Sequence, residues 1–534
     1  MARLKRLNFV YIVLCMVVLC SGCGSMENLV GDLETAQRAE EVNKHGLMVV
    51  VDGVELETAA KMSKNMHLMM PVREVAEFLK VQVQVSESDT CYIDGQRIES
   101  ALIRETSDEG EEIWIDFFQI SSVLNVHWEW MDEAYLMSIT SIDEDKLPAV
   151  YDLREIRPLN SVADQGSYGT CWAFASIAAL EMAEGVDEDT HFSVDHMTMN
   201  NGFCISPTDG GDYNMAIAYL SAWEGPVYEA DDMYGDGETN ADLTAVKHLQ
   251  EVQILKEKNI DDLKRWIIKF GGVESPIFMS ILSQWDETDD YDSATYAYYY
   301  TGDEKANHDV VIVGWDDSYS RENFKRMPEQ DGAFICRNSW GEAFGDEGYF
   351  YVSYEDAVLG QQAVVYSRLD YPDNYSRIYQ SDMLGWVGTL GYGEESAWFA
   401  NVYTAQSDEQ LKAVSFYAVG PESCYDLFVV TDYTNAEDLS QGTYLGSGYL
   451  EESGYYTIDL TKTISVDSGE SFAIVVCMTT PDYERPIAIE YKSSDITKDV
   501  NLEDGQGFVS YDGTNWSSSE QEYECNICLK AFTD

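Results

Sequence analysis

Basic side chains are scarce in this 534-residue sequence, in which 33 lysines and arginines accompany 96 aspartates and glutamates, for a formal net charge of −63. A protein that binds nucleic acid needs a basic stripe to displace the counterions of the phosphates. The few cations here are spread through an acidic background, so we exclude nucleic acid as a partner. Charge of this size keeps a protein soluble but does not specify its fold, so function has to be sought in individual sites.

Cysteine is also sparse, at eleven residues, three of which lie in the first 23 positions. The other eight are too scattered to be the disulfide framework of a small fold, although disulfides remain possible; they are Cys91, Cys171, Cys204, Cys336, Cys424, Cys477, Cys525 and Cys528. The last two form a CxxC pair, which elsewhere marks a zinc or redox site. No second pair or histidine cluster accompanies it, so we interpret it as packing in a final strand and predict no metal or other cofactor.

Aromatic side chains are not lacking, at 12% of the residues, and 45% of the sequence is hydrophobic. Such a composition excludes wholesale disorder, because it can fill folded cores. A single core stops growing at roughly 250 to 300 residues. The length therefore predicts two to four domains.

The first 22 residues lack acidic side chains; three cations precede the apolar run Phe9–Leu19 and then small residues, the pattern of a secretory signal peptide. The ending Leu-Cys-Ser-Gly-Cys resembles the lipobox of bacterial lipoproteins, which implies lipid attachment at Cys23 and a location at the outer face of a bacterial membrane. An uncleaved anchor or an ordinary signal is the alternative, and either way we expect export. Residues 23–45 are polar and free of aromatic side chains, which predicts a tether.

Residues 46–142 contain short alternating apolar runs that predict strands. Asp52-Gly53 and Asp94-Gly95 between them are hairpin turn signals. A helix is predicted at residues 72–79, directly after a proline. The segment resembles the small domain at the N-terminus of copper amine oxidases and in many bacterial surface proteins. The resemblance implies an α+β stalk domain, and the histidines of this segment lack the spacing of copper ligands.

The central part of the sequence places one cysteine in a setting that suits a nucleophile. A glycine-containing loop runs into a stretch from Trp172 to Ala183 that is apolar nearly all round, so we expect a buried helix with Cys171 at its N-terminus. Unpaired N–H groups at a helix N-terminus favour the thiolate, and a nearby imidazolium lowers the thiol pKa further. Downstream, His308 opens a strand-like apolar run and Asn338 precedes Ser-Trp-Gly.

Five separated blocks of this region resemble the papain-like cysteine peptidases and occur in the order found in that family. The resemblance covers residues 147–368, and the blocks are Val162–Ala175, Asp209–Ala216, Asn307–Trp315, Arg337–Gly341 and Gly345–Val352. It implies an α+β fold with a helical half and a β-barrel-like half. It also implies an enzyme that hydrolyses peptide bonds through a covalent thioester.

The resemblance implies a catalytic role for four residues. Cys171 is the expected nucleophile, His308 is its acid and base partner, and Asn338 orients the imidazole. The side-chain N–H of Gln165 and the backbone N–H of Cys171 are expected to form the oxyanion hole. No cofactor takes part in this chemistry.

Three further residues are expected to bind the substrate or to protect the site. Gly210 and Gly211 match the glycine pair that lines the substrate, where a missing side chain lets an extended backbone approach and pair. Trp340 matches the ring that shields the histidine–asparagine hydrogen bond from water. Loss of these residues is expected to weaken catalysis without removing the nucleophile.

The sequence departs from the family pattern at several positions. Tyr168 replaces a usual cysteine, which puts the neighbouring disulfide in doubt, and Phe344 replaces a usual tryptophan. Asp309 follows the histidine, where a small residue is usual, and we expect its carboxylate to raise the pKa of His308. No helical inhibitory pro-segment of the usual type lies between the signal and Leu147, so the control of activity stays open.

Residues 372–534 contain short apolar strands separated by Asp, Gly and Ser, with no helical stretch. The pattern predicts an all-β sandwich whose two sheets bury one face each. After a papain-like region, it resembles the lectin-like sandwich of some bacterial members of that family. The resemblance makes a glycan a possible partner of this domain.

The sequence therefore predicts a multidomain protein with a stalk domain, a papain-like peptidase domain and a lectin-like sandwich. We expect a lipid-anchored cysteine endopeptidase that acts on extracellular proteins or peptides. The alternative is a surface adhesin or glycan-binding protein whose peptidase domain is catalytically silent. The acidic surface is expected to favour cationic peptides, an effect that salt should weaken.

Overall fold

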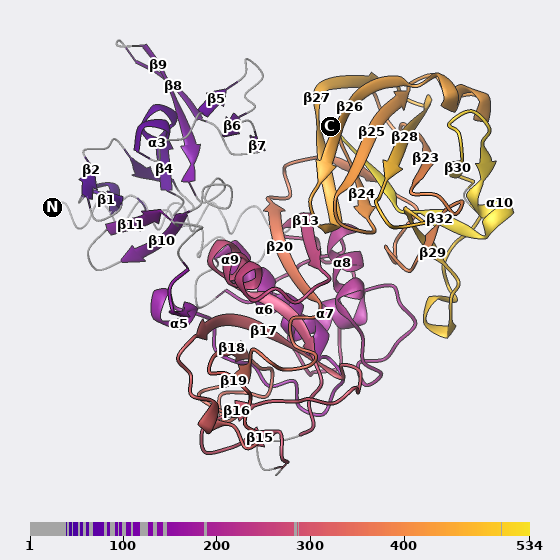
Figure 1. Ribbon diagram of the computed structural model, residues 1–534. Helices are drawn as coiled ribbons and strands as arrows, with labels where there is room; N and C mark the ends of the chain where they lie inside the picture. Colours follow the sequence, from indigo (N-terminus) through magenta and orange to yellow (C-terminus); the bar gives the residue numbers. More distant parts are fainter. Residues whose placement is uncertain are drawn as a thin grey trace. The chain divides into compact units, whose positions relative to one another are not determined.

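The computed structural model describes residues 147–534, apart from residues 186–189, 282–285, 287 and 504, together with short segments between residues 39 and 141 (Figure 1). The chain divides into two compact units, Met1–Glu144 and Asp145–Asp534. The predicted signal peptide and Cys23 lie outside the described residues, as does most of the predicted tether. Within the described part of the chain, no helix has the length and apolar character needed to cross a membrane.

The first unit contains short strands in three sheets and the helix α3. The strands pair in the orders β10-β11-β1-β2, β3-β4-β9-β8 and β5-β6-β7. The strands on either side of both predicted hairpin turns pair antiparallel, which confirms the hairpins. The helix confirms the prediction over residues 72–79 within one residue, whereas the resemblance to a copper amine oxidase domain stays a prediction. The elements are β1 (Met48–Val51), β2 (Val54–Leu56), β3 (Lys61–Met62), β4 (Leu68–Pro71), α3 (Val72–Phe78), β5 (Val83–Val85), β6 (Cys91–Ile93), β7 (Gln96–Ile98), β8 (Ile103–Ser107), β9 (Gly110–Asp116), β10 (Val126–Met131) and β11 (Leu136–Ser141).

The helical half of the central region is built around α6. Every side chain from Trp172 to Met182 is buried, as expected for a helix that is apolar nearly all round. The helix ends at Gly185, which adopts a left-handed conformation with φ of 66° and donates its N–H to Glu181 O. The helices of this region are α5 (Leu153–Ile156), α6 (Cys171–Glu184), α7 (Val194–Met199), α8 (Tyr213–Ser221) and α9 (Ile260–Phe270), with a 3-10 turn, η2, at Arg321–Asn323.

The strands of the central region form one end of a long sheet in the order β15-β16-β19-β18-β17-β14-β20-β13. The strand β17 lies in the middle of this half and is buried along nearly its whole length, with α6 and α9 packed against it (Figure 1). The strands are β12 (Val150–Asp152), β13 (His248–Leu255), β14 (Val273–Ile277), β15 (Tyr291–Asp292), β16 (Ala297–Tyr298), β17 (His308–Asp316), β18 (Ala333–Arg337), β19 (Tyr349–Ser353) and β20 (Ala363–Asp370).

The C-terminal part is a sandwich, as predicted. A sheet in the order β26-β25-β28-β23-β30-β31 and a second layer that includes β27, β24 and β33 share one hydrophobic core. The expectation of no helix was wrong, because Ser518 caps a short helix, α10. The elements are β21 (Arg377–Tyr379), β22 (Gly388–Leu390), β23 (Ser396–Thr404), β24 (Glu409–Ala418), β25 (Ser423–Val430), η3 (Ala436–Gln441), β26 (Thr443–Leu450), β27 (Ser453–Val466), β28 (Ser471–Thr479), β29 (Ile487–Tyr491), η4 (Asp495–Thr497), β30 (Gly507–Ser510), β31 (Ser517–Ser518), α10 (Ser519–Tyr523), β32 (Cys525–Ile527) and β33 (Leu529–Thr533).

One sheet runs through both the central and the C-terminal parts. The strand β13 pairs antiparallel with β20 on one side and with β27 on the other, in the register Glu251↔Tyr456 to Ile254↔Ser453. The sheet therefore continues from β13 through β27, β24 and β33 to β21. The sequence alone did not predict this continuity.

Candidate active site

The nucleophile candidate lies where expected, at the first residue of α6. Thr170 precedes Cys171 at the N-cap but makes no side-chain cap, and its hydroxyl lies 2.7 Å from the hydroxyl of Tyr234. The single proton of Tyr234 goes to Gln165 O at 3.0 Å, so the threonine is the donor in that pair. Phe174 packs edge-on against Tyr234, with ring centroids 4.7 Å apart. Tyr234 thus fixes the loop before Cys171, a role that sequence reasoning missed.

The loop before the nucleophile is also tied to the loop after β18. Gln165 donates its backbone N–H to Ser339 O at 2.8 Å and accepts a hydrogen bond from the Ser339 hydroxyl at 2.7 Å through Oε1. Its Nε2 donates to Tyr168 O at 2.7 Å. Asp164 and Trp340 form an isolated antiparallel bridge beside these bonds. One Gln165 amide proton is therefore engaged in holding the loop, and the amide carries a second proton besides.

His308 and Asn338 meet although they lie at the ends of different strands. His308 is the first residue of β17, and Asn338 follows β18. The Nε2 of His308 lies 2.7 Å from the Oδ1 of Asn338, and both side chains are buried. An amide oxygen only accepts, so this bond places a proton on Nε2 and leaves Nδ1 as the basic nitrogen. Asn338 Oδ1 also accepts from the backbone N–H of Ser339 at 2.8 Å, which fixes the amide.

Aromatic rings surround the imidazole on one side. The ring centroid of Trp340 lies 5.0 Å from that of His308, with the planes inclined by 40°. Phe344, which stands where the family pattern has a tryptophan, packs edge-on against Trp340 at 5.0 Å and against Phe350 at 5.6 Å. The smaller ring at position 344 is therefore buried support for Trp340.

Asp309 does not act on His308 as expected. Its Oδ2 accepts a hydrogen bond from the Cys171 thiol at an Sγ–Oδ2 distance of 3.9 Å. Burial lowers the pKa of His308 to about 4, opposed by the hydrogen bond to Asn338. Successive side chains of a strand point to opposite faces, so the carboxylate faces the thiol rather than the imidazole beside it in sequence. The prediction of a raised histidine pKa was wrong.

The thiol itself is held in its neutral form. Burial first, and the negative charge of Asp309 second, raise the pKa of Cys171 to about 12. The backbone N–H groups of Cys171 and Trp172 at the helix start do lower this pKa, as predicted, but they are outweighed. Burial and the nearby charge of Asp212 raise the pKa of Asp309 to about 7. Among the described residues, the Cys171 thiol thus donates its hydrogen bond to Asp309 and not to His308.

The glycine pair lies beside the nucleophile's helix. Gly210 has a φ of +83°, which favours glycine. A Cβ on Gly211 would lie 2.5 Å from the indole of Trp172, the residue after Cys171, so no side chain fits. Gly169 is restricted in the same way, because its Cβ would lie 2.8 Å from Gly210 N. The three glycines let the chain before Tyr213 approach the start of α6 closely and leave the Gly211 backbone exposed.

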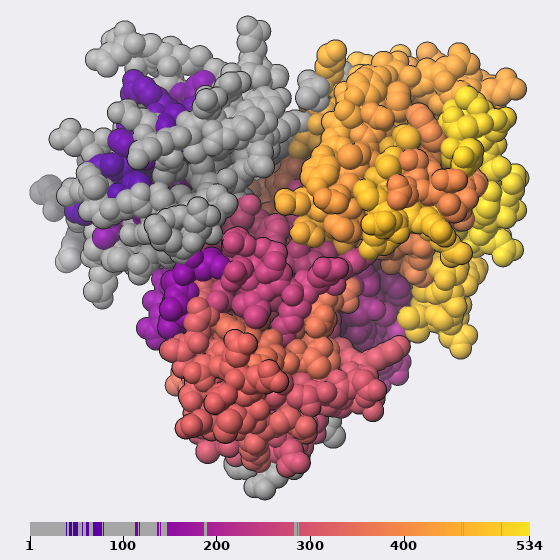
Figure 2. Space-filling view, in the orientation of Figure 1, coloured from indigo at the N-terminus to yellow at the C-terminus, as the bar shows by residue number. Residues whose placement is uncertain are grey.

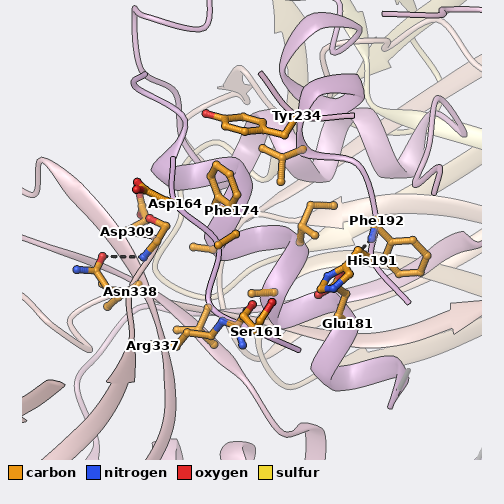
Figure 3. Close-up of a pocket in the computed structure, with 18 of the residues that line it drawn as sticks. Ser161, Asp164, Phe174, Glu181, His191, Phe192, Tyr234, Asp309, Arg337 and Asn338 are labelled. Atoms are coloured by element: carbon orange, nitrogen blue, oxygen red, sulfur yellow. Dashed lines mark hydrogen bonds and ion pairs between the residues drawn. The ribbon is translucent and has the colours of Figure 1, made fainter. Parts of the chain in front are cut away.

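A cavity of about 230 Å³ lies between α6 and the strands β17 and β18 (Figure 3). Asp309 and Asn338 lie at one end, and Glu181 and His191 lie at the other. Asn338 lines the cavity, whereas Cys171 and His308 are not among its lining residues. We therefore place the reactive groups beside the cavity and not inside it.

The far end of the cavity is lined by groups that bind one another. Glu181 accepts hydrogen bonds from Phe192 N at 2.8 Å and from Asn160 Nδ2 at 2.9 Å. Burial raises the pKa of Glu181 to about 7 in spite of these bonds. Arg337 donates to Asn160 O at 2.6 Å and to Ser161 O at 2.7 Å. These contacts connect the residue before Asn338, through Asn160, to the last turn of α6.

Two parts of the chain match known protein families. Residues 147–368 match the papain family cysteine protease family, and residues 378–533 match the lectin like domain family. The chain contains a papain-family cysteine protease domain followed by a lectin-like domain. The chain is similar to the solved structure of a variant of the clostridial cysteine protease Cwp84 after propeptide cleavage. The two sequences are 26% identical, and the structures match with a TM-score of 0.63. The match covers 72% of this chain and 99% of that one.

A second Cwp84 structure, of the cysteine protease and lectin-like domains of a surface layer associated protein of Clostridium difficile, is also 26% identical. Its TM-score is 0.61, and the match covers 73% of this chain and 89% of that one. Cysteine proteinase 15A of Pisum sativum is 28% identical over 232 residues, which are 41% of this chain and 61% of the pea protein. A viral cathepsin of Spodoptera exigua nuclear polyhedrosis virus (strain US) is 29% identical over 209 residues, 38% of this chain and 56% of the relative. The chain thus spans about three fifths of the length of these curated relatives.

The CxxC pair lies in the interior of the lectin-like domain. Cys525 and Cys528 are buried, and burial raises the pKa of the Cys525 thiol to about 12. Among the described residues, no group of three or more histidines, cysteines or acids is placed to hold a metal ion. The free cysteines of the described part are Cys171, Cys204, Cys336, Cys424, Cys477, Cys525 and Cys528.

Proposed function

We propose that this protein is a cysteine peptidase that hydrolyses peptide bonds of extracellular proteins or peptides. The observation that carries the proposal is the 2.7 Å bond from His308 Nε2 to Asn338 Oδ1, formed in the same domain in which Cys171 begins a buried helix. That bond leaves Nδ1 as a neutral base at pH 7, since the pKa of His308 is about 4. The relatives named as cysteine proteinases and cathepsins support the same activity.

The reaction requires the thiol to leave Asp309 and to give its proton to His308 Nδ1. The resulting thiolate attacks the substrate carbonyl, and the oxyanion is met by the backbone N–H of Cys171 and the remaining side-chain N–H of Gln165. The imidazolium then gives its proton to the leaving amine, which breaks the peptide bond and leaves a thioester. Water, deprotonated by the same imidazole, hydrolyses the thioester and restores the thiol. Asn338 keeps the imidazole oriented throughout and does not change its charge.

The substrate is proposed to lie across the start of α6, with its extended backbone paired to the exposed backbone at Gly211. Gly210 leaves open space for that approach, and Trp340 packs against the imidazole. The order of the proposed domains follows the sequence analysis: signal peptide 1–22, tether 23–45, stalk 46–142, peptidase 147–368 and sandwich 372–534. The related Cwp84 is described as surface layer associated. We extend that location to this protein as an exported, lipid-anchored enzyme attached through Cys23, with a glycan as the possible ligand of its lectin-like domain.

Peptide cleavage by the purified protein tests the activity. A peptide library is incubated under reducing conditions, and products are identified by mass spectrometry. We expect cleavage by the unaltered protein, loss of cleavage in Cys171→Ala, and unchanged cleavage in Cys424→Ala, which removes an exposed thiol instead. Retained cleavage in Cys171→Ala, or no cleavage by the unaltered protein, contradicts the proposal.

A second function, that of an adhesin with a silent peptidase domain, is favoured by one observation. The pKa of Cys171 is about 12 and that of His308 is about 4, so neither group is charged in the resting state. Full-length Cys171→Ala protein on a glycan array, together with alkylation of the unaltered protein by iodoacetamide, separates the two functions. Tight glycan binding together with an unreactive Cys171 favours the adhesin, whereas alkylation that inactivates the protein favours the peptidase.

A further inference from the structure

The segment from Gly202 to Gly211 connects α7 to α8 without a helix or strand of its own. Its position must therefore come from the contacts it makes. On the protease side, Gly169 donates its N–H to Pro207 O at 2.8 Å, and Gly211 lies against the indole of Trp172. The proposed function places the substrate backbone against Gly210 and Gly211 at the end of this segment, which we call the substrate wall, and the inference about how it is held rests on that proposal.

The other side of the same segment is held by the lectin-like domain. The backbone N–H of Cys204 donates to Ile496 O at 2.8 Å, and its thiol donates to Asp499 Oδ2 at 3.0 Å. Gly202 makes a third contact with the lectin-like domain, because a Cβ at this position would lie 3.0 Å from Leu384 Cδ2. Figure 2 shows gold atoms of the C-terminal domain against purple atoms of the protease domain at the lower right.

The loop that contacts Cys204 follows β29 and contains Ile496 and Asp499. It is held by hydrogen bonds within its own domain. Thr497 Oγ1 accepts the backbone N–H groups of Ser493 at 2.8 Å and Ser494 at 3.1 Å, which closes the turn at η4. Asn526 in β32 donates to Asn501 O at 2.8 Å, beyond the other end of the turn. The bond from Asn526 therefore ties the loop after β29 to the sandwich.

A closed turn lies between Cys204 and the glycines. Ser206 donates its backbone N–H to Asp209 Oδ2 at 2.8 Å, and Asp209 returns its N–H to Ser206 O at 2.9 Å. Residues 206–209 thus behave as one unit between the two sets of contacts. Gly210 follows this turn directly.

We propose that the lectin-like domain positions the substrate-binding wall of the protease domain, with Asp499 and Cys204 as positioning residues. The lectin-like domain is then part of the peptide-binding machinery and not only an appended module. Neither residue touches the reacting atoms, so the inference concerns substrate binding and leaves the chemical steps unchanged.

The test compares Asp499→Ala and Cys204→Ala with Asp495→Ala, a matched control on the same exposed turn. A net hydrogen bond contributes about a factor of 2 to 10 in an equilibrium. We expect KM for an extended peptide to rise about 2- to 10-fold in each of the first two variants, with kcat and the alkylation rate of Cys171 unchanged. Cys204→Ser keeps a donor and should restore KM, and the double variant should be no worse than either single one.

Hydrogen exchange provides a readout that does not depend on activity. The backbone amides of residues 204–211 should exchange faster in Asp499→Ala and Cys204→Ala than in Asp495→Ala, at equal melting temperature. Unchanged exchange in this segment overturns the inference, whether or not the protein cleaves peptides. Unchanged KM in an active protein overturns it as well, whereas absence of cleavage by the unaltered protein contradicts only the proposed function.

Discussion

Catalysis should depend strongly on the hydrogen bond between His308 and Asn338. In Asn338→Ala the imidazolium formed during the reaction loses a buried acceptor, which for a charged donor costs about 1.5–3 kcal/mol. We therefore expect kcat for a peptide substrate to fall about 10- to 100-fold with little change in KM. Steady-state kinetics at fixed pH check this. An unchanged kcat in a folded variant would show that the bond is structural only.

Asp309 should control the ionisation of the nucleophile. Its carboxylate raises the pKa of Cys171, so the neutral Asp309→Asn lowers that pKa. The rate of alkylation by iodoacetamide, which follows the thiolate, should rise at a lower pH in this variant than in the unaltered protein. Asp303→Asn, an exposed change five residues before His308, is the control and should leave the profile in place. A shift toward higher pH would refute the assignment.

Sequence reasoning located the residues of the site better than their contacts. The pairing of His308 with Asn338 could be predicted because both belong to blocks of the family resemblance, and the structure brings them together, whereas the catalytic role of Cys171 stays a prediction. The side of the strand from which Asp309 acts could not be predicted, since it depends on which face of β17 meets α6. Tyr234 lies in no motif of the resemblance, and only its position in space reveals its bond to Gln165.

At the scale of elements, the start of α6 packs closely against the chain at Gly211. In Gly211→Ala the new Cβ would lie 2.5 Å from the indole of Trp172, so the chain or the ring must move. Such overpacking costs about 1–3 kcal/mol, and we expect a lower melting temperature together with a raised KM. Gly446→Ala on β26 is the control, because nothing lies within 4 Å of its Cβ position. Equal effects of the two changes would exclude a special role for Gly211.

Local elements were predictable where the pattern itself is local. The buried helix followed from a continuous apolar stretch, and the two hairpins in the first unit followed from Asp-Gly turns. The pairing of β13 with β27 joins Glu251 to Tyr456 across about two hundred residues of sequence. Apolar alternation shows that a strand exists but not which strand lies beside it, so this pairing had no signal.

The acidity of the whole molecule should appear in substrate preference. At a net charge of −63, a cationic peptide is attracted from a distance, and added salt screens the attraction over about 10 Å at 0.1 M. We expect the ratio of kcat/KM for a basic peptide to that for an acidic peptide of equal length to fall as sodium chloride is raised. Competition assays at low and high salt measure the ratio. Equal turnover of the two peptides at low salt would contradict the expectation.

The pairing of β13 with β27 also predicts the effect of cleaving the chain between the protease and lectin-like domains. The residues that connect β20 to β21, 371–376, separate the two family-matched segments in sequence, yet the sheet runs past them through β13 and β27. Trp223 of the protease domain also stacks on Phe532 of β33, with ring centroids 5.5 Å apart. A protein nicked between residues 371 and 376 should therefore elute as one particle and separate into two only on denaturation. Cleavage of this linker should therefore leave the two domains associated.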